Sequence, residues 1–70
     1  MSKSYTFFFN GQEYYTESSI SLSDLIKYFN YNSSLFILEY NKFICDKKEW
    51  DKIKIKENDT IEIVTIVGGG

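Results

Sequence analysis

Few residues in this sequence could carry chemistry, and the most unusual of them stand at its end. The chain closes with an apolar run from Ile61 to Val67 and then three glycines, Gly68, Gly69 and Gly70. Glycine loses the most entropy on ordering and has no side chain to bury, so such a tail adds nothing to a core. Either the tail is a frayed end or an expression remnant, or its terminal carboxylate has a function.

A glycine tail has physical properties that suit a reaction at its end. Without Cβ atoms it can enter a narrow slot, and three extended residues reach roughly 10 Å beyond a folded domain. The α-carboxylate of Gly70 is ionised at neutral pH, because such groups have a pKa of about 3.3 to 3.7. The flexible tail loses entropy when it docks, so affinity for a partner must come from elsewhere on the domain.

The side chains offer little other chemistry. The chain has no histidine and one cysteine, Cys45, so it lacks an imidazole base and a thiolate cluster for zinc. We therefore expect no bound metal or cofactor. Cys45 follows the apolar Ile44, which is typical of a packing residue, and only Lys47 and Lys48 are placed in sequence to lower its pKa. The sequence leaves the role of Cys45 open.

Composition places the chain among small folded domains. At 70 residues it can form one core, and 43% hydrophobic and 19% aromatic residues favour folding. The net charge of −2 gives no basic field for nucleic acid. There is no charged and apolar leader and no apolar run of about 18 residues, so we expect no membrane segment. The abundance of Asn, Lys and Ile without Arg, His, Ala or Pro indicates an AT-rich genome, either a low-GC bacterium or an organelle.

The elements that must position the tail begin with a hairpin and a helix. Tyr5 to Asn10 reads as an aromatic strand, Asn10-Gly11 as a tight turn and Glu13 to Glu17 as the return strand. Ser21 and Asp24 then form a capping-box pattern at the start of a helix. The apolar positions of that helix recur at i, i+3, i+4 and i+7 and should face a sheet; they are Leu22, Leu25, Ile26 and Phe29. The helix is expected to end near Asn30 to Asn32.

Short strands fill the second half of the chain. The predicted elements are a strand over Leu35 to Tyr40, a turn at Asn41-Lys42, a strand over Phe43 to Cys45, one helical turn over Lys48 to Asp51 around Trp50, a returning segment over Ile53 to Ile55, and a last strand over Thr60 to Val67. Trp50 is expected to be a packing anchor. This order predicts an α+β fold of the β-grasp, ubiquitin-like type, with one main helix across one face of a mixed sheet and the last strand parallel to the first.

The closing stretch KKEWDKIKIKENDTIEIVTIVGGG resembles the bacterial and plastid sulfur carriers of the ThiS family. The matching features are Trp50 in a short turn, the acidic turn at Asn58-Asp59, the run IEIV and the terminal glycines. The N-terminal half is similar more loosely, through the Asn-Gly turn and the helix start at Ser21 to Leu25. The resemblance implies a β-grasp domain over residues 1–67 and a reactive glycine tail over residues 68–70.

The resemblance also implies a mechanism and partners. The chain would be a protein co-substrate and not an enzyme, and its Gly70 carboxylate would be adenylated by a ThiF-type enzyme that holds ATP and Mg²⁺. A desulfurase or persulfide would supply sulfur, and the resulting thiocarboxylate would pass to a ThiG-type thiazole synthase in thiamin biosynthesis. The implied compartment is the bacterial cytoplasm or the plastid stroma. Gly68 and Gly69 would form the tail that enters the enzyme.

Three other functions share the terminal glycines. One is a MoaD-like sulfur carrier for molybdopterin, and another is a ubiquitin-like modifier that is joined to lysines of target proteins through Gly70. The third is a β-grasp interaction module whose tail is inert. The carrier and the modifier share the activation of the carboxylate and differ in whether sulfur or an amine attacks it.

A partner surface is expected on one face of the last strand. Analogy with ubiquitin-like folds places Ile61, Ile63, Ile37 and Ile44 inside. It leaves an exposed apolar patch for partner binding, formed by Leu38, Val64 and Ile66. The alternative is that Val64 and Ile66 belong to a core covered by the hairpin aromatics, which are Tyr5, Phe7, Phe8 and Phe9.

Overall fold

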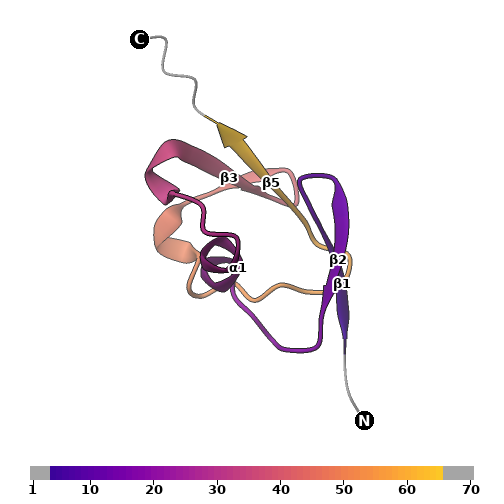
Figure 1. Ribbon diagram of the computed structural model, residues 1–70. Coiled ribbons are helices and arrows are strands. Elements are labelled where there is room, and N and C mark those ends of the chain that lie inside the picture. The colour runs from indigo at the N-terminus through magenta and orange to yellow at the C-terminus, as the bar shows by residue number, and fades with distance from the viewer. Residues whose placement is uncertain (1–3, 66–70) are drawn as a thin grey trace.

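The computed structural model describes residues 4–65 as a five-stranded mixed sheet that curves around one α-helix (Figure 1). The strands are β1 (Tyr5–Phe9), β2 (Gln12–Thr16), β3 (Phe36–Tyr40), β4 (Phe43–Cys45) and β5 (Thr60–Thr65), the helix is α1 (Leu22–Tyr28), and two short 3-10 helices cover Ser33–Leu35 and Lys47–Glu49. The strand order in the sheet is β2-β1-β5-β3-β4. The predicted fold class is confirmed.

β5 is the central strand of the sheet. It pairs in parallel with β1, with Phe8 opposite Thr60 and Phe9 opposite Ile61. It also pairs antiparallel with β3, with Phe36 opposite Thr65 at one end and Tyr40 opposite Ile61 at the other. The predicted parallel pairing of the first and last strands is therefore confirmed. The residues predicted to form the tail lie outside the described part of the chain.

Left-handed backbone at two turns sets the registers of the sheet. Asn10 (φ 54°) and Gly11 (φ 80°) join β1 to β2, and Asn41 (φ 51°) and Lys42 (φ 74°) join β3 to β4. Two-residue turns of this kind match the twist of the strands that they connect. The Asn10-Gly11 and Asn41-Lys42 turns were both predicted from sequence.

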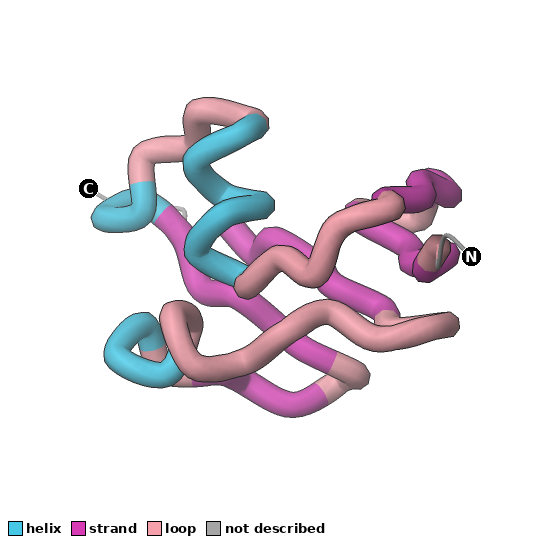
Figure 2. Tube along the Cα trace, turned by 90° about the horizontal axis from the view of Figure 1, so that it is seen from below, coloured by secondary structure: helices cyan, strands magenta, loops and turns pink. Residues whose placement is uncertain are grey.

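The capping box predicted for α1 is present. The Ser21 hydroxyl accepts a hydrogen bond from the Asp24 N–H (3.1 Å), and the Asp24 carboxylate accepts one from the Ser21 N–H (2.9 Å). The helix ends at Tyr28, and Asn30 takes a left-handed conformation (φ 60°) just beyond it. Figure 2 shows α1 lying over one face of the strands, while the chain from the second 3-10 helix to β5 passes along the edge of the molecule.

The core between α1 and the sheet is rich in aromatic rings. Leu22, Leu25 and Ile26 are buried on the sheet side of α1, as predicted, and Phe29 packs partly buried against them. Trp50 is also buried, stacks on Phe36 with ring centroids 5.8 Å apart, and donates its indole N–H to the Cys45 carbonyl (3.0 Å). The prediction of Trp50 as a packing anchor is confirmed.

Three facing assignments in the β3 and β4 region are wrong. Leu38 was expected on the surface, but it is 0% exposed, because it is the cross-strand partner of Ile63 and shares its helix-facing side of the sheet. Ile44 was expected inside, but it is 69% exposed, because it lies opposite Glu39 on the other side. Ile37 was also expected inside, but it lies half-buried on that same outer side, opposite Val64.

Candidate functional site

The candidate site is the end of β5, from which the chain continues towards its terminus. Ile66, Gly68, Gly69 and Gly70, all proposed from sequence as site residues, lie outside the described residues. What the structure describes is the strand that carries them. Its last described residues, Val64 and Thr65, are exposed. Positioning of the tail therefore depends on how firmly β5 is held.

A buried carboxylate anchors the start of β5. Asp59 is 7% exposed and accepts hydrogen bonds from the Tyr40 hydroxyl (2.6 Å), the Asn41 side-chain amide (3.1 Å) and the Lys56 backbone N–H (2.7 Å). Its own carbonyl accepts from the Phe8 N–H (2.9 Å). These bonds satisfy a buried charge and join the turn before β5 to β1 and β3.

Two asparagine side chains extend the hold on β5. Asn41 accepts a hydrogen bond from the Thr60 N–H through its Oδ1 (2.8 Å). Parallel pairing with β1 ends where Phe9 lies opposite Ile61. Beyond that point the Asn10 side chain bonds to β5, because its Oδ1 accepts a hydrogen bond from the Ile63 N–H (2.9 Å). Asn10 thus serves both the hairpin turn and the exit strand. The sequence indicated only its turn role.

The surroundings of Tyr40 keep its hydroxyl group protonated, so that it can donate a hydrogen bond to Asp59. Burial raises the pKa of Tyr40 well above its usual value, and its hydrogen bond to Asp59 and the charge of that carboxylate raise the pKa further. The phenol is therefore protonated throughout the neutral range and donates to Asp59.

The sheet face opposite α1 presents an apolar surface near the end of β5. Val64 is 41% exposed, lies opposite the half-buried Ile37, and shares the face with the exposed Ile44 on β4. Glu39 and Glu62 pair with each other on the same face. We call Val64, Ile37 and Ile44 the open-face patch. It retains one of the three residues expected from sequence, since Leu38 is in the core and Ile66 is not described.

Sequence reasoning missed Ile37 and Ile44 as surface residues, although one signal was available. In the strand Phe36–Tyr40 the alternate positions are Ile37 and Glu39 on one side, and a glutamate is rarely buried without a partner. That pattern places Leu38 inside. Val64 is exposed, so the alternative that it belongs to a core under the hairpin aromatics is wrong.

Cys45 lies away from β5 and is not activated. It is half-buried on β4, and burial raises the pKa of its thiol, with the charges of Glu49 and Asp46 acting in the same direction. The two lysines considered from sequence do not lower it. A protonated thiol is a poor nucleophile, so the structure favours the packing role.

Residues 4–65 hold no group of three or more His, Cys, Asp or Glu side chains that could bind a metal ion. In the same part of the chain, the helices are too short and too polar to cross a membrane.

Comparison with known proteins identifies close sequence relatives. A family model described as the ThiS family matches residues 7–70. An uncharacterized protein, ycf40, from Trieres chinensis is 69% identical over 93% of this chain and 89% of its own length. The sulfur carrier protein ThiS of Bacillus subtilis (strain 168) is 34% identical over 71% of this chain and 76% of its own length.

A solved structure has the same fold. The crystal structure of the thiamine biosynthesis protein ThiS from Geobacter metallireducens superposes with a TM-score of 0.80, covering 93% of this chain and 99% of that one. The two sequences are 19% identical, so this likeness establishes the fold alone.

Proposed function

Because the chain belongs to the ThiS family, we propose that it is a sulfur carrier for thiazole formation in thiamin biosynthesis. The observation that carries the proposal is that the family match runs to residue 70 and so includes the three terminal glycines. A relative named as a sulfur carrier, the Bacillus subtilis protein, supports it. The chain would act as a protein co-substrate.

The proposed chemistry takes place on the Gly70 carboxylate. One carboxylate oxygen attacks the α-phosphorus of ATP, pyrophosphate leaves, and an acyl-adenylate forms. The terminal sulfur of a persulfide then attacks the acyl carbon and AMP leaves. Reduction of the resulting acyl disulfide by a thiol releases the thiocarboxylate. The ATP and Mg²⁺ belong to the adenylating enzyme, and this chain supplies the reacting carbon.

This division of labour agrees with the side chains of the described region. Its lone thiol has a raised pKa, and its buried carboxylate, Asp59, is occupied by three hydrogen bonds within the fold. The contribution of the domain is therefore positional. Asp59 holds the start of β5 and Asn10 holds the strand past the end of β1, so that the strand that precedes the tail is fixed in the sheet.

Binding affinity for the adenylating enzyme would come from the open-face patch. Val64 and Ile44 are exposed apolar side chains on the sheet face opposite α1. Glu39 lies between Ile44 and Glu62 in one cross-strand row, next to the row of Ile37 and Val64, which favours a partner with basic residues beside its apolar contacts. Leu38 has no part in this surface.

The proposed partners are a ThiF-type adenylating enzyme, a ThiG-type thiazole synthase and a desulfurase or other persulfide donor. The compartment remains a prediction, either the bacterial cytoplasm or the plastid stroma.

The experiment that tests the pathway offers the loaded chain to two acceptors. The thiocarboxylate form should support thiazole formation by a ThiG-type synthase with its other substrates. The same form should not support molybdopterin formation by the large subunit of a molybdopterin synthase. The reverse preference would replace the thiamin assignment with the MoaD-like alternative, and stable amide conjugates with other proteins would favour the modifier.

A further inference from the structure

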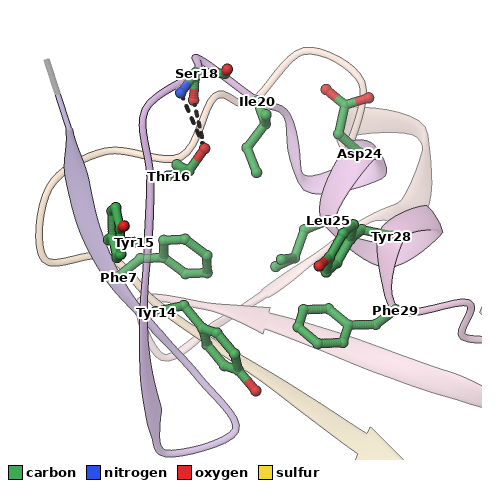
Figure 3. Close-up of a pocket in the computed structure, with 10 residues that line it drawn as sticks. All are labelled: Phe7, Tyr14, Tyr15, Thr16, Ser18, Ile20, Asp24, Leu25, Tyr28 and Phe29. Carbon is green, nitrogen blue, oxygen red and sulfur yellow. Dashed lines mark hydrogen bonds between the residues drawn. The ribbon is translucent and has the colours of Figure 1, made fainter. Parts of the chain in front are cut away.

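The sheet ends at β2, and a groove lies between this edge strand and α1. The groove has a volume of about 520 Å³ and is open to solvent. Figure 3 shows Phe7 and Tyr14 on the hairpin side and Leu25, Tyr28 and Phe29 on the helix side, with open space between them. The proposed sulfur chemistry does not use this region, because β1 separates β2 from β5 in the sheet.

The floor of the groove is formed by buried side chains, and contacts between residues bound it at both ends. Phe7 and Leu25 form the floor, and both are almost fully buried. At one end the rings of Tyr14 and Phe29 meet edge to face, with centroids 5.4 Å apart. At the other end the Thr16 hydroxyl exchanges hydrogen bonds with Ser18 (3.2 Å each), which turns the chain away from the edge, as Figure 3 shows. The exposed ring of Tyr28 forms the rim, being 82% exposed.

The edge strand presents main-chain groups along this groove. In a hairpin closed by a two-residue turn, the flanking residues Phe9 and Gln12 form a hydrogen-bonded pair, so alternate residues of β2 direct their N–H and C=O groups away from β1. Those residues are Glu13 and Tyr15. Within residues 4–65 neither makes a backbone hydrogen bond to another segment outside its hairpin.

An edge strand beside an apolar groove is the arrangement that binds an extended peptide by strand addition. The peptide backbone pairs with the edge, and alternate side chains enter the groove. The charges decide which peptide fits. From Ser4 to Ile26 every charged side chain is acidic: Glu13, Glu17 and Asp24. Glu13 and Tyr15 lie on the side of β2 that faces away from α1, where outward-facing residues of an added strand would sit opposite them, and Glu17 follows directly after the strand.

Asp24 contributes less to this preference than the two glutamates. Its pKa is lowered, chiefly by the Ser21 backbone hydrogen bond, so it is ionised, but Lys54 and Lys27 are near enough to act on it as well. Glu13 and Glu17 have no lysine among the described residues of their own hairpin.

We propose that β2 and the groove beside α1 bind an extended segment of a partner protein, which adds to the sheet as a further strand with apolar residues facing the groove and basic residues facing outward. A second copy of this chain fits less well, because its own β2 strand carries an acidic residue, Glu13, and no basic residue that could match Glu13 of the first copy. A partner held here leaves the end of β5 accessible, so the chain could be tethered while its tail reacts.

The test uses the full chain and the blocked peptide Ile-Lys-Val-Thr-Val-Lys-Ile. Its outward residues, Lys, Thr and Lys, match the spacing of Glu13, Tyr15 and Glu17 in either strand direction. Titration followed by NMR should shift the amide signals of Glu13 and Tyr15, and hydrogen exchange at these amides should slow. Peptides with proline for the central Thr, or with Glu for both Lys, should bind at least about tenfold more weakly, because they lose a backbone donor or the charge match.

Matched protein variants localise the site. Tyr28→Lys removes the groove rim and should weaken peptide binding about tenfold or more, while the melting temperature stays close to that of the parent. Phe43→Lys makes the same change at an aromatic residue that is 77% exposed on β4, the opposite edge, and should bind normally. The proposal is overturned if the proline peptide binds equally well, if Phe43→Lys and not Tyr28→Lys loses binding, or if the chain without peptide self-associates through β2.

Discussion

At the scale of single residues, the proposed reacting group and the side chains that hold its strand in place are different residues. The proposed reacting atom is the carboxyl carbon of Gly70, which has no side chain to assist it, whereas the side chains of Asp59, Asn41 and Asn10 hold β5 by hydrogen bonds. The Asp59 carboxylate accepts three hydrogen bonds. The Asn10 side chain accepts one from the Ile63 N–H, beyond the last backbone pair of β1 and β5. Asn10, Asn41 and Asp59 were visible in the sequence only as turn residues, because their long-range partners depend on a strand register that no local pattern reveals.

The tyrosine that donates to Asp59 should make stability fall at alkaline pH. Burial and the Asp59 carboxylate raise the pKa of Tyr40 in the folded chain above the ordinary tyrosine value. Above about pH 10 the unfolded chain therefore releases this proton while the folded chain keeps it, so the free energy of unfolding decreases as pH rises. Urea denaturation between pH 9 and 11, roughly spanning the ordinary tyrosine pKa, should show this decrease.

Tyr40→Phe is the control for that measurement. It should be less stable than the parent by about 1 kcal/mol at neutral pH, because Asp59 loses one donor. The difference from the parent should shrink as pH rises above 10, roughly the ordinary tyrosine pKa. A difference that is constant or grows over this range would show that Tyr40 does not titrate as described.

At the scale of elements, the sequence predicted what local patterns control and failed where register decides. The capping box, the helix face and both two-residue turns were predicted correctly, because each depends on residues a few positions apart. The prediction of which side of the strand Phe36–Tyr40 faces α1 was wrong. Apolar residues occupy both sides of this strand, and only the charge of Glu39 and the pairing of Leu38 with Ile63 determine which side meets α1. For the candidate site, the exposed Val64 was found and Ile37 and Ile44 were not.

One substitution made on each face of the sheet tests this correction. Leu38→Asp places a charge in the core and should cost several kcal/mol, enough to unfold a domain this small. Val64→Asp should leave the melting temperature nearly unchanged and weaken binding to the adenylating enzyme by about 2 kcal/mol. Circular dichroism melts and calorimetric titration measure the two effects. A folded Leu38→Asp chain, or a Val64→Asp chain with parental affinity, would contradict the assignment of the open-face patch.

The exit end of β5 should loosen when its side-chain hydrogen bond is removed. Asn10→Gly keeps a residue that tolerates the left-handed turn conformation but deletes the acceptor for the Ile63 N–H. Loss of one such bond corresponds to about 1 kcal/mol, or roughly fivefold faster exchange of the Ile63 amide hydrogen. The Ile61 amide, within the region paired with β1, should change less. Equal acceleration at both amides would mean that the substitution loosens the whole sheet.

At the scale of the whole molecule, the proposed function makes the described domain the part that partners bind while the terminal carboxylate reacts. Its sheet has three distinct surfaces: a face packed on α1, an open face with Val64 and Ile44, and an edge at β2 beside the groove. The proposed enzyme and the proposed strand-adding partner would use different surfaces, so both could bind one chain. The central position of β5 suits this arrangement, since strands on both sides hold the segment that carries the tail.

The truncated chain that lacks Gly69 and Gly70 separates folding from function. It should melt like the full chain, because the two glycines removed have no side chain to bury in the core. It should nevertheless accept no sulfur, and the same should hold for a chain with one alanine added after Gly70, since the reacting carbon is displaced from the enzyme site. Cys45→Ala should load normally, because its thiol is not the sulfur carrier in this account. Sulfur loading of the truncated chain would place the acceptor elsewhere.

The most direct test of the central claim is the intact mass of the full chain after incubation with a ThiF-type enzyme, ATP, Mg²⁺, a persulfide donor and a thiol reductant. We predict an ATP-dependent mass gain equal to the exchange of one oxygen for sulfur, located by fragmentation at Gly70. An unchanged mass with cognate partners present, or a gain located at Cys45, would contradict it.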